Sequence, residues 1–151
     1  MYNNFIAFQV EINNQTKSPV RDDFLAAIVK KALLKCGLKR NKNYSVSLAF
    51  ISAGDIQKIN IKYRKINQPT DILSFSEYPS LKIVKQAGEK NIFLGELILC
   101  YDYIRNSAKI NHRIIQQELK EVVVHGVLHL LGYQHGKQMF DLQRELINSS
   151  K

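Results

Sequence analysis

The sequence is short of cysteine and contains no apolar run that approaches the length of a membrane span. Its two cysteines, Cys36 and Cys100, are far apart and form no C-x-x-C pair, so we expect free thiols in a reducing compartment, although either remains a candidate metal ligand. Residues 1–10 lack the cationic and apolar regions of a secretory signal. These absences predict a cytoplasmic protein that does not use a membrane as a partner.

Acidic residues are also scarce, because 13 Asp and Glu stand against 22 Lys and Arg and leave a net charge of +9. Such a surplus favours association with polyanions such as RNA, and the alternative is a solvated basic face that maintains solubility. Several basic residues cluster late in the first expected helix and in the loop after it. From this cluster we expect the following residues to bind RNA phosphates: Lys30, Lys31, Lys39 and Lys42.

The chain has no internal repeat, low-complexity tract or evident linker, and its length fits one domain, 1–151, with a core of its own. Apolar alternation bounded by turn residues predicts four strands. These strands span residues 5–12, 44–51, 71–76 and 92–100. Inside the last of them, Gly95 predicts a bulge or a close approach to the backbone.

Apolar residues at helical spacing predict five helices, the first of which begins at Ser18 and ends at Gly37. The other four span residues 52–64, 102–109, 112–131 and 137–148, and a loop is expected from 78 to 91. This order predicts the α+β class, with a small mixed β-sheet of about four strands packed with about five helices.

Three of the chain's four histidines lie in residues 121–135, which read E-V-V-V-H-G-V-L-H-L-L-G-Y-Q-H. His125 and His129 are four residues apart, so a helix places both imidazoles on one face. Gly132 can take the left-handed conformation that ends a helix, which lets the chain turn and bring His135 back toward the pair. The spacing therefore predicts a metal site on a C-terminal helix, although ordinary histidines bonded to backbone or water are the alternative.

Three nitrogen ligands with a fourth position open to water are typical of catalytic zinc. The spacing H-x-x-x-H-x-x-G-x-x-H matches the metzincin proteases, but their general base, a glutamate, is replaced here by Gly126, which cannot accept a proton. Elsewhere, Glu121 either orients a ligand or pairs with a lysine, and Asp71 either caps a turn or lies at the site. No residue is an evident general base.

Three segments together resemble the YbeY family of bacterial ribosomal RNA maturation factors. They are H-G-V-L-H-L-L-G-Y-Q-H at 125–135, Y-R-K-I-N-Q-P-T-D-I-L-S-F at 63–75 and L-G-E-L at 94–97. The resemblance covers nearly the whole chain, with the segments in the family's order. It implies one Zn²⁺ per chain, held by the three histidines. It also implies a single-strand-specific endoribonuclease that acts in 3′ end maturation of small-subunit (16S) ribosomal RNA and in ribosome quality control.

The same resemblance implies catalytic roles for Arg64 and His125, and it implies single-stranded ribosomal RNA and the small ribosomal subunit as partners, with no DNA. The planar guanidinium of Arg64 can clamp a phosphate, whereas the residues alone favour a surface arginine at a helix end. A zinc-bound water has a pKa near 7 and can supply hydroxide to attack phosphorus.

Three positions depart from the family pattern, with Gln134 and Glu96 where aspartate is usual and Ser76 where proline is usual. A carboxylate lost beside His135 removes a possible hydrogen-bond partner for a ligand, and such partners change metal affinity tenfold or more. Two other functions stay open from the sequence. They are a non-catalytic ribosome-assembly factor with a structural zinc, and another metal-dependent hydrolase.

Overall fold

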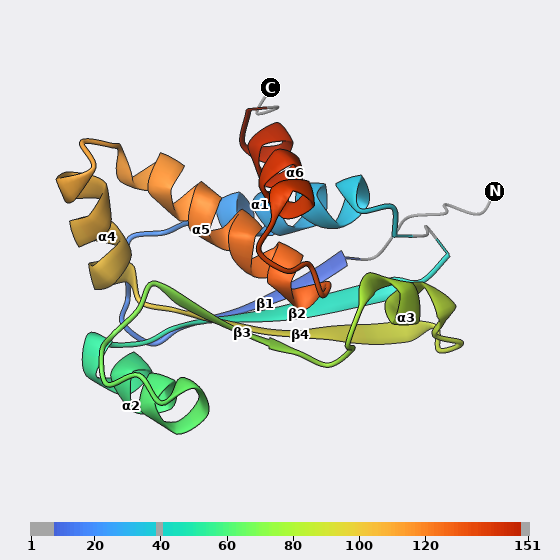
Figure 1. Ribbon diagram of the computed structural model, residues 1–151, viewed down its shortest axis with the longest axis horizontal. Helices are drawn as coiled ribbons and strands as arrows, with labels where there is room; N and C mark the ends of the chain where they lie inside the picture. The colour runs from blue at the N-terminus through green and yellow to red at the C-terminus, as the bar shows by residue number, and fades with distance from the viewer. Residues whose placement is uncertain (1–7, 39–40, 149–151) are drawn as a thin grey trace.

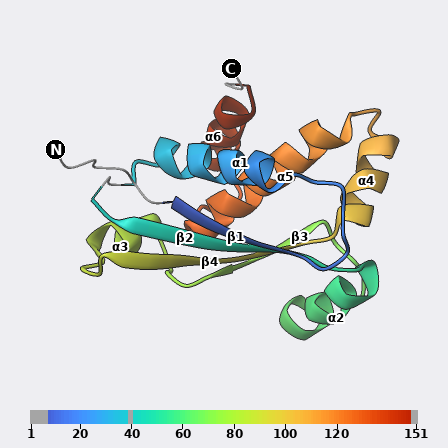
Figure 2. The same cartoon turned by 180° about the vertical axis from the view of Figure 1, so that it is seen from behind.

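Four strands form one mixed sheet in the computed structural model, which describes residues 8–38 and 41–148 (Figures 1 and 2). They are β1 (Phe8–Asn14), β2 (Asn43–Phe50), β3 (Ile72–Ser76) and β4 (Asn91–Leu99). Their order in the sheet is β1-β2-β4-β3, in which the first three run parallel and β3 runs antiparallel to β4. Strand β3 is therefore an edge strand, and the predicted α+β class with a mixed sheet is confirmed.

Six helices lie in the described part of the chain, one more than predicted. They are α1 (Asp22–Lys35), α2 (Ala53–Arg64), α3 (Leu81–Gln86), α4 (Tyr101–Ile110), α5 (Ile115–Leu130) and α6 (Lys137–Asn148). Helices α1 and α5 lie side by side on one face of the sheet, and α2 lies on the other face near one end (Figures 1 and 2). None of the helices in the described residues combines the length and apolar character that a membrane crossing requires.

The main core fills the space between the sheet and helices α1, α5 and α6. Strand β2 shows how the sequence dictates this packing, because Val46, Leu48 and Phe50 are buried while the residues between them are half-buried, as the alternation predicted. A second, smaller core lies beneath α2 on the opposite face of the sheet. Its buried members are Ile51, Ile56, Leu73, Ile98 and Cys100.

The start of the first helix differs from the prediction, whereas its end agrees, because Gly37 with φ of 79° follows shortly after Lys35. The helix begins at Asp22 rather than at Ser18, because the side chain of Asn14 holds Ser18 in a turn. Asn14 Oδ1 accepts from the Ser18 N–H at 2.9 Å, and its Nδ2 donates to the Ser18 carbonyl at 2.8 Å. The first strand reaches Asn14 instead of ending at residue 12, and its predicted start at 5–7 lies outside the described residues.

Helix α3 is the additional helix, and it lies inside the predicted loop. Ser80 caps it by accepting a hydrogen bond from the Ile83 N–H at 3.3 Å, and Val84 is its buried residue. Six residues with one buried position carry too little periodicity to be recognised in a sequence.

Helix α5 begins three residues later than predicted, since His112 takes a positive φ of 54° between α4 and α5.

The prediction for Gly95 is confirmed in both respects. Ser45 pairs with Phe93 while Val46 pairs with Gly95, so Leu94 is an extra residue and forms a bulge in β4. Gly95 has φ of 141°, and a Cβ there would lie 2.2 Å from the backbone oxygen of Phe75. The bulge therefore requires glycine.

Helix α5 lies directly against the edge strand β3, and two serines hold it there. Ser74 Oγ donates to the carbonyl of Gly126, and Ser76 Oγ donates to the carbonyl of His129, both at 3.3 Å. A Cβ at Gly126 would lie 2.5 Å from the δ-methyl of Ile72, so the glycine permits this close approach. The contact places the histidines of α5 beside the open edge of the sheet.

Candidate metal centre

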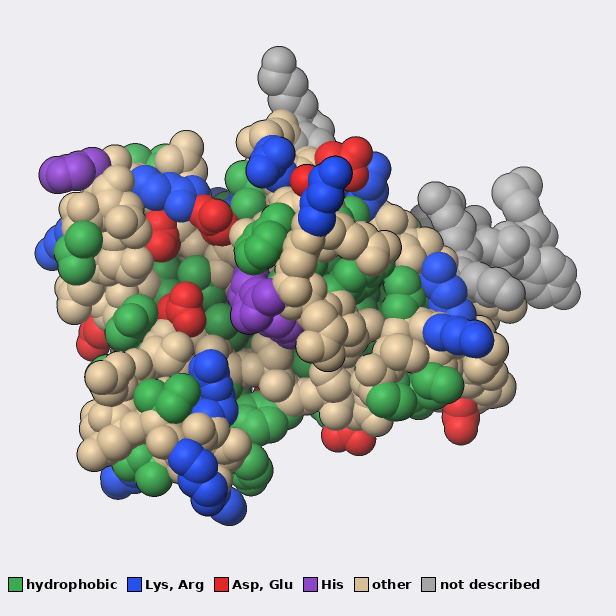
Figure 3. All heavy atoms as spheres, viewed as in Figure 1, with side chains coloured by type: hydrophobic (Ala, Val, Ile, Leu, Met, Phe, Trp, Pro, Cys, Tyr) green, Lys and Arg blue, Asp and Glu red, His purple; other side chains and the backbone are tan. Residues whose placement is uncertain are grey.

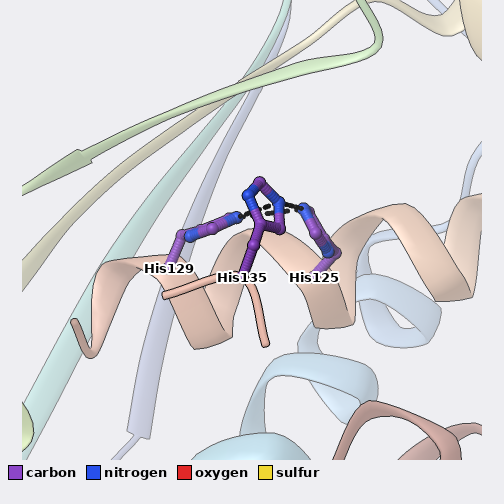
Figure 4. A group of neighbouring side chains, drawn as sticks. All are labelled: His125, His129 and His135. Carbon is purple, nitrogen blue, oxygen red and sulfur yellow. Dashed lines mark hydrogen bonds between the residues drawn. The ribbon is translucent and has the colours of Figure 1, made fainter. Parts of the chain in front are cut away.

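The turn after α5 brings the third histidine to the other two, as the position of Gly132 predicted (Figure 4). Gly132 has φ of 88°, and its N–H donates to the carbonyl of His129 at 3.0 Å. The Tyr133 N–H donates to the carbonyl of Leu128, also at 3.0 Å. These two bonds form a Schellman motif, which reverses the chain and returns His135 to the helix face.

The three Nε2 atoms converge on one point. His125 and His129 are separated by 3.0 Å, His129 and His135 by 3.3 Å, and His135 and His125 by 3.4 Å (Figure 4). Two nitrogens bound to one tetrahedral zinc at its usual bond length are about 3.3 Å apart. The three imidazoles therefore fit a single small metal ion, and they are the cluster of candidate ligands found among the described residues.

Two further contacts orient the rings. His129 Nδ1 lies 3.0 Å from the carbonyl oxygen of Tyr133, and His125 Nδ1 lies 2.9 Å from Oε1 of Gln143 on α6. Because both partners are acceptors, both Nδ1 atoms carry the hydrogen and both Nε2 atoms keep their lone pairs for a metal. Gln143 was missed by sequence reasoning, which considered only Gln134, an exposed residue.

The pKa of His129 is lowered from its ordinary value. Burial is the largest cause, followed by the nearby His125, while the hydrogen bond to the Tyr133 carbonyl opposes the shift. His135 and Arg64 add smaller effects in the lowering direction. The imidazole of His129 is therefore neutral at neutral pH, which is the protonation state that a metal ligand needs.

A cavity of about 630 Å³ joins the histidines to the end of α2. Its lining residues are Tyr63, Arg64, Thr70, Asp71, Ile72, Leu73, Ser74, Phe75, His125, His129 and His135. Arg64 is the last residue of α2, because Lys65 takes the left-handed conformation that ends the helix. The structure thus brings Arg64 and the three histidines into one cavity, although Arg64 and His125 are 61 positions apart in the sequence. Figure 3 shows the histidines in a hollow at the centre of this face, with Lys and Arg side chains on either side.

Among the lysines predicted to bind RNA, Lys30, Lys31 and Lys42 do not line this cavity. Lys30 and Lys31 lie on α1, which runs behind α5 in the view of Figure 1 and in front of α5 in the view of Figure 2. The ammonium of Lys42 donates to the backbone carbonyl of Ala87. Lys39 lies outside the described residues, so the role of these lysines stays a prediction.

The two acidic candidates have different positions. Glu121 forms an ion pair with Arg113, which also lies 3.3 Å from Glu118, and it does not line the cavity. Asp71 does line the cavity, and its Oδ1 also accepts from the Ile72 N–H at 2.7 Å and from Thr70 Oγ1 at 3.2 Å. Asp71 therefore both holds the turn and faces the site, and it is the one carboxylate among the lining residues.

Neither cysteine belongs to the cluster. Both are free and buried, and burial is the main reason why the pKa of each thiol is raised. The side chain of Tyr133 hydrogen-bonds to Cys36, which ties the turn after α5 to the end of α1. Cys36 thus supports the turn from behind rather than binding a metal.

Replacing Gly132 with alanine is expected to weaken both the fold and metal binding. A Cβ there would lie 2.8 Å from the Pro79 carbonyl oxygen and from the Ser80 Cα, in a backbone conformation that alanine disfavours. Strain of this kind costs about 1–3 kcal/mol and would displace the turn that carries His135. Thermal unfolding and zinc titration measure the two effects.

The matched control is Gly136→Ala, because the nearest atom to a Cβ at Gly136 is 4.0 Å away. This variant should unfold at the wild-type temperature and bind metal normally. Unchanged unfolding and unchanged zinc affinity in Gly132→Ala would contradict the role given to the turn.

Comparison with known proteins gives a consistent result. The family model described as "Endoribonuclease YbeY" matches residues 11–151. The endoribonuclease YbeY of Limosilactobacillus reuteri is 32% identical over 153 residues, which cover 92% of this chain and 95% of the relative. The corresponding protein of Treponema denticola is 33% identical over 139 residues, covering 88% and 84%.

One solved structure shares the fold. A protein from Thermotoga maritima, whose solution structure is known, superposes with a TM-score of 0.60 at 24% sequence identity. The match covers 93% of this chain and 87% of that chain. At this identity the likeness bears on the fold alone.

Proposed function

Because this chain belongs to the YbeY family of endoribonucleases, we propose that it is a zinc-dependent enzyme that cleaves single-stranded RNA internally. The proposal rests on one observation above the others, namely that Arg64 shares a cavity with three imidazoles whose Nε2 atoms converge within 3.4 Å. An arginine suits phosphate, and three nitrogen ligands suit a catalytic metal. Residues 1–151 act as one domain in this proposal.

Each residue has a distinct task in the proposed reaction. His125, His129 and His135 hold the metal, while Gln143 and the Tyr133 carbonyl keep two of the rings oriented. The metal, when bound, supplies a Lewis acid that activates water for attack on phosphorus. Arg64 binds the phosphate through its planar guanidinium and neutralises the negative charge that grows there as the bond breaks.

Support for RNA as the substrate comes from the family and from the net charge of +9. The finer assignment is 3′ end maturation of 16S ribosomal RNA and ribosome quality control on the small subunit, and it rests on the resemblance of the three segments. Lys30, Lys31, Lys39 and Lys42 would attract the RNA through their positive charge, so they contribute to the salt dependence of binding. DNA is not an expected substrate.

The proposal is tested by comparing metal-free and zinc-loaded protein on unstructured RNA and on a duplex of the same sequence. Chelation should abolish cleavage, and added zinc should restore it. The duplex should be cut at least about tenfold more slowly, because the bases of a paired strand stay stacked and the strand cannot enter the cavity. Gel analysis of end-labelled RNA measures the rates. No cleavage by zinc-loaded protein across many RNAs would contradict the proposal and favour an assembly factor with a structural zinc.

Peptide hydrolysis is the weaker candidate among metal-dependent reactions. The residue after the first histidine is Gly126, and a Cβ built there points at Ile72 and Leu97 in the sheet. The position of the metzincin base therefore carries no proton acceptor and faces the core. A protease assay with unfolded peptides should give no cleavage above the metal-free control.

A further inference from the structure

The cavity at the metal centre passes around the open edge of β3. Ser74 and Ser76 reach up to α5, whereas Leu73 belongs to the small core beneath α2 and Phe75 packs against that core. Both Ser74 and Phe75 line the cavity with the histidines. An RNA strand bound at the metal centre can therefore continue around the edge of β3 to the other face of the sheet.

A second cavity, of about 370 Å³, adjoins the first on that other face. Its lining residues are Ile59, Lys62, Tyr63, Phe75, Glu77, Phe93, Glu96 and Ile98. Tyr63 and Phe75 line both cavities, so the two hollows meet at these two rings. Arg64, the proposed phosphate ligand, directly follows Tyr63 in the chain.

One of the two rings at this junction is exposed and the other, Phe75, is half-buried. Tyr63 is 59% exposed, and it meets Phe75 edge to face at a centroid distance of 5.0 Å. Phe93 in the second cavity is 42% exposed, and the Lys62 ammonium lies 5.2 Å from the centre of the Tyr63 ring. Exposed aromatic faces beside a phosphate-binding arginine are typical of single-stranded nucleic acid sites.

We propose that Tyr63 and Phe75 form a stacking subsite for one nucleobase of the RNA strand whose phosphate lies at Arg64. This inference rests on the proposed function and specifies how the substrate is held. The charge of the second cavity supports a base rather than a further phosphate, because its charged lining residues are two carboxylates, Glu77 and Glu96, and one ammonium, Lys62, which leave a net negative charge that repels phosphate. The subsite gives a physical reason for single-strand preference, since a base within a duplex is already stacked and paired and cannot turn out to meet Tyr63.

The test is an abasic scan of a short single-stranded RNA, in which one base at a time is removed while the backbone is kept. For the zinc-loaded wild type, removing the base that stacks should lower kcat/KM by about tenfold, a typical loss for one stacked base. Tyr63→Ala should lose about tenfold on the intact RNA and should no longer respond to removal of that base. This lack of additivity is the signature of a direct contact.

Two further variants separate stacking from bulk. Tyr63→Phe keeps the ring and should retain activity, whereas Tyr63→Leu keeps an apolar side chain without the ring and should behave like Tyr63→Ala. Tyr103→Ala is the matched control, because Tyr103 is 42% exposed on α4 and lines neither cavity. Zinc content should be equal in all of these proteins.

The inference is overturned if Tyr63→Ala matches the wild type on every RNA, if Tyr63→Leu is as active as Tyr63→Phe, or if the abasic effect persists in Tyr63→Ala. If the second cavity instead binds a peptide from a protein partner, Tyr63→Ala should match the wild type on every RNA. Failure of the proposed function is separate, because it appears as a zinc-loaded wild type that cleaves nothing. In that case RNA affinity, measured by fluorescence anisotropy with the metal bound, compares the same variants and decides the question.

Discussion

Replacing His129 with alanine should lower the affinity for zinc by more than about a hundredfold and abolish RNA cleavage. Its Nε2 atom is one corner of the triangle of three nitrogens, at 3.0 Å from that of His125 and 3.3 Å from that of His135. Loss of a residue that merely orients a ligand costs tenfold to a hundredfold in affinity, so loss of a ligand should cost more. Competition with a chromophoric chelator measures the affinity, and elemental analysis measures the metal content.

The fourth histidine provides the control. His112 lies outside the cluster, between α4 and α5, where its φ is 54°. Asparagine tolerates this conformation better than alanine does, so His112→Asn is the suitable variant and should bind zinc as the wild type does. Stoichiometric, tightly bound zinc in His129→Ala would rule out the three-histidine site.

Arg64→Ala should fold, bind zinc normally and cleave single-stranded RNA about a hundredfold more slowly at saturating substrate, as expected when a preorganised donor to a growing charge is removed. A guanidinium stays protonated and offers no lone pair, so Arg64 cannot be a metal ligand. Its side chain is exposed at the end of α2, and its removal leaves the core intact. Cleavage rate and zinc content should be measured on the same preparations.

Two companion variants make this result specific. Lys58→Ala removes the same charge from an exposed position on α2 that does not line the cavity, and it should cleave at nearly the wild-type rate. Arg64→Lys keeps the charge without the planar fork and should be intermediate. Full activity in Arg64→Ala would exclude the residue from the mechanism.

The cluster of three histidines could be predicted from the sequence because its geometry is local. Two histidines one helical turn apart, followed by a glycine that reverses the chain, define most of the site within eleven residues. The helix period and the Schellman motif do not depend on distant parts of the protein. The same locality made the alternation of β2 and the bulge at Gly95 recognisable.

Other features of the site depend on how distant segments pack, and no local pattern reveals them. Gln143 reaches His125 only because α6 folds back across α5. Arg64 enters the cavity only because the edge strand β3 lies between α2 and α5, and its importance was inferred from the resemblance alone. The short helix α3 was missed because one buried residue produces no periodicity.

The close contact between α5 and β3 also limits how this scaffold can evolve. A side chain at position 126 would enter a space occupied by the δ-methyl groups of Ile72 and Leu97, 2.5 and 3.1 Å from the new Cβ. A glutamate there would bury a carboxylate among apolar groups instead of presenting a base to the metal, so a single substitution cannot convert this site to metzincin chemistry. A general base at this position would require α5 to move away from the sheet as well.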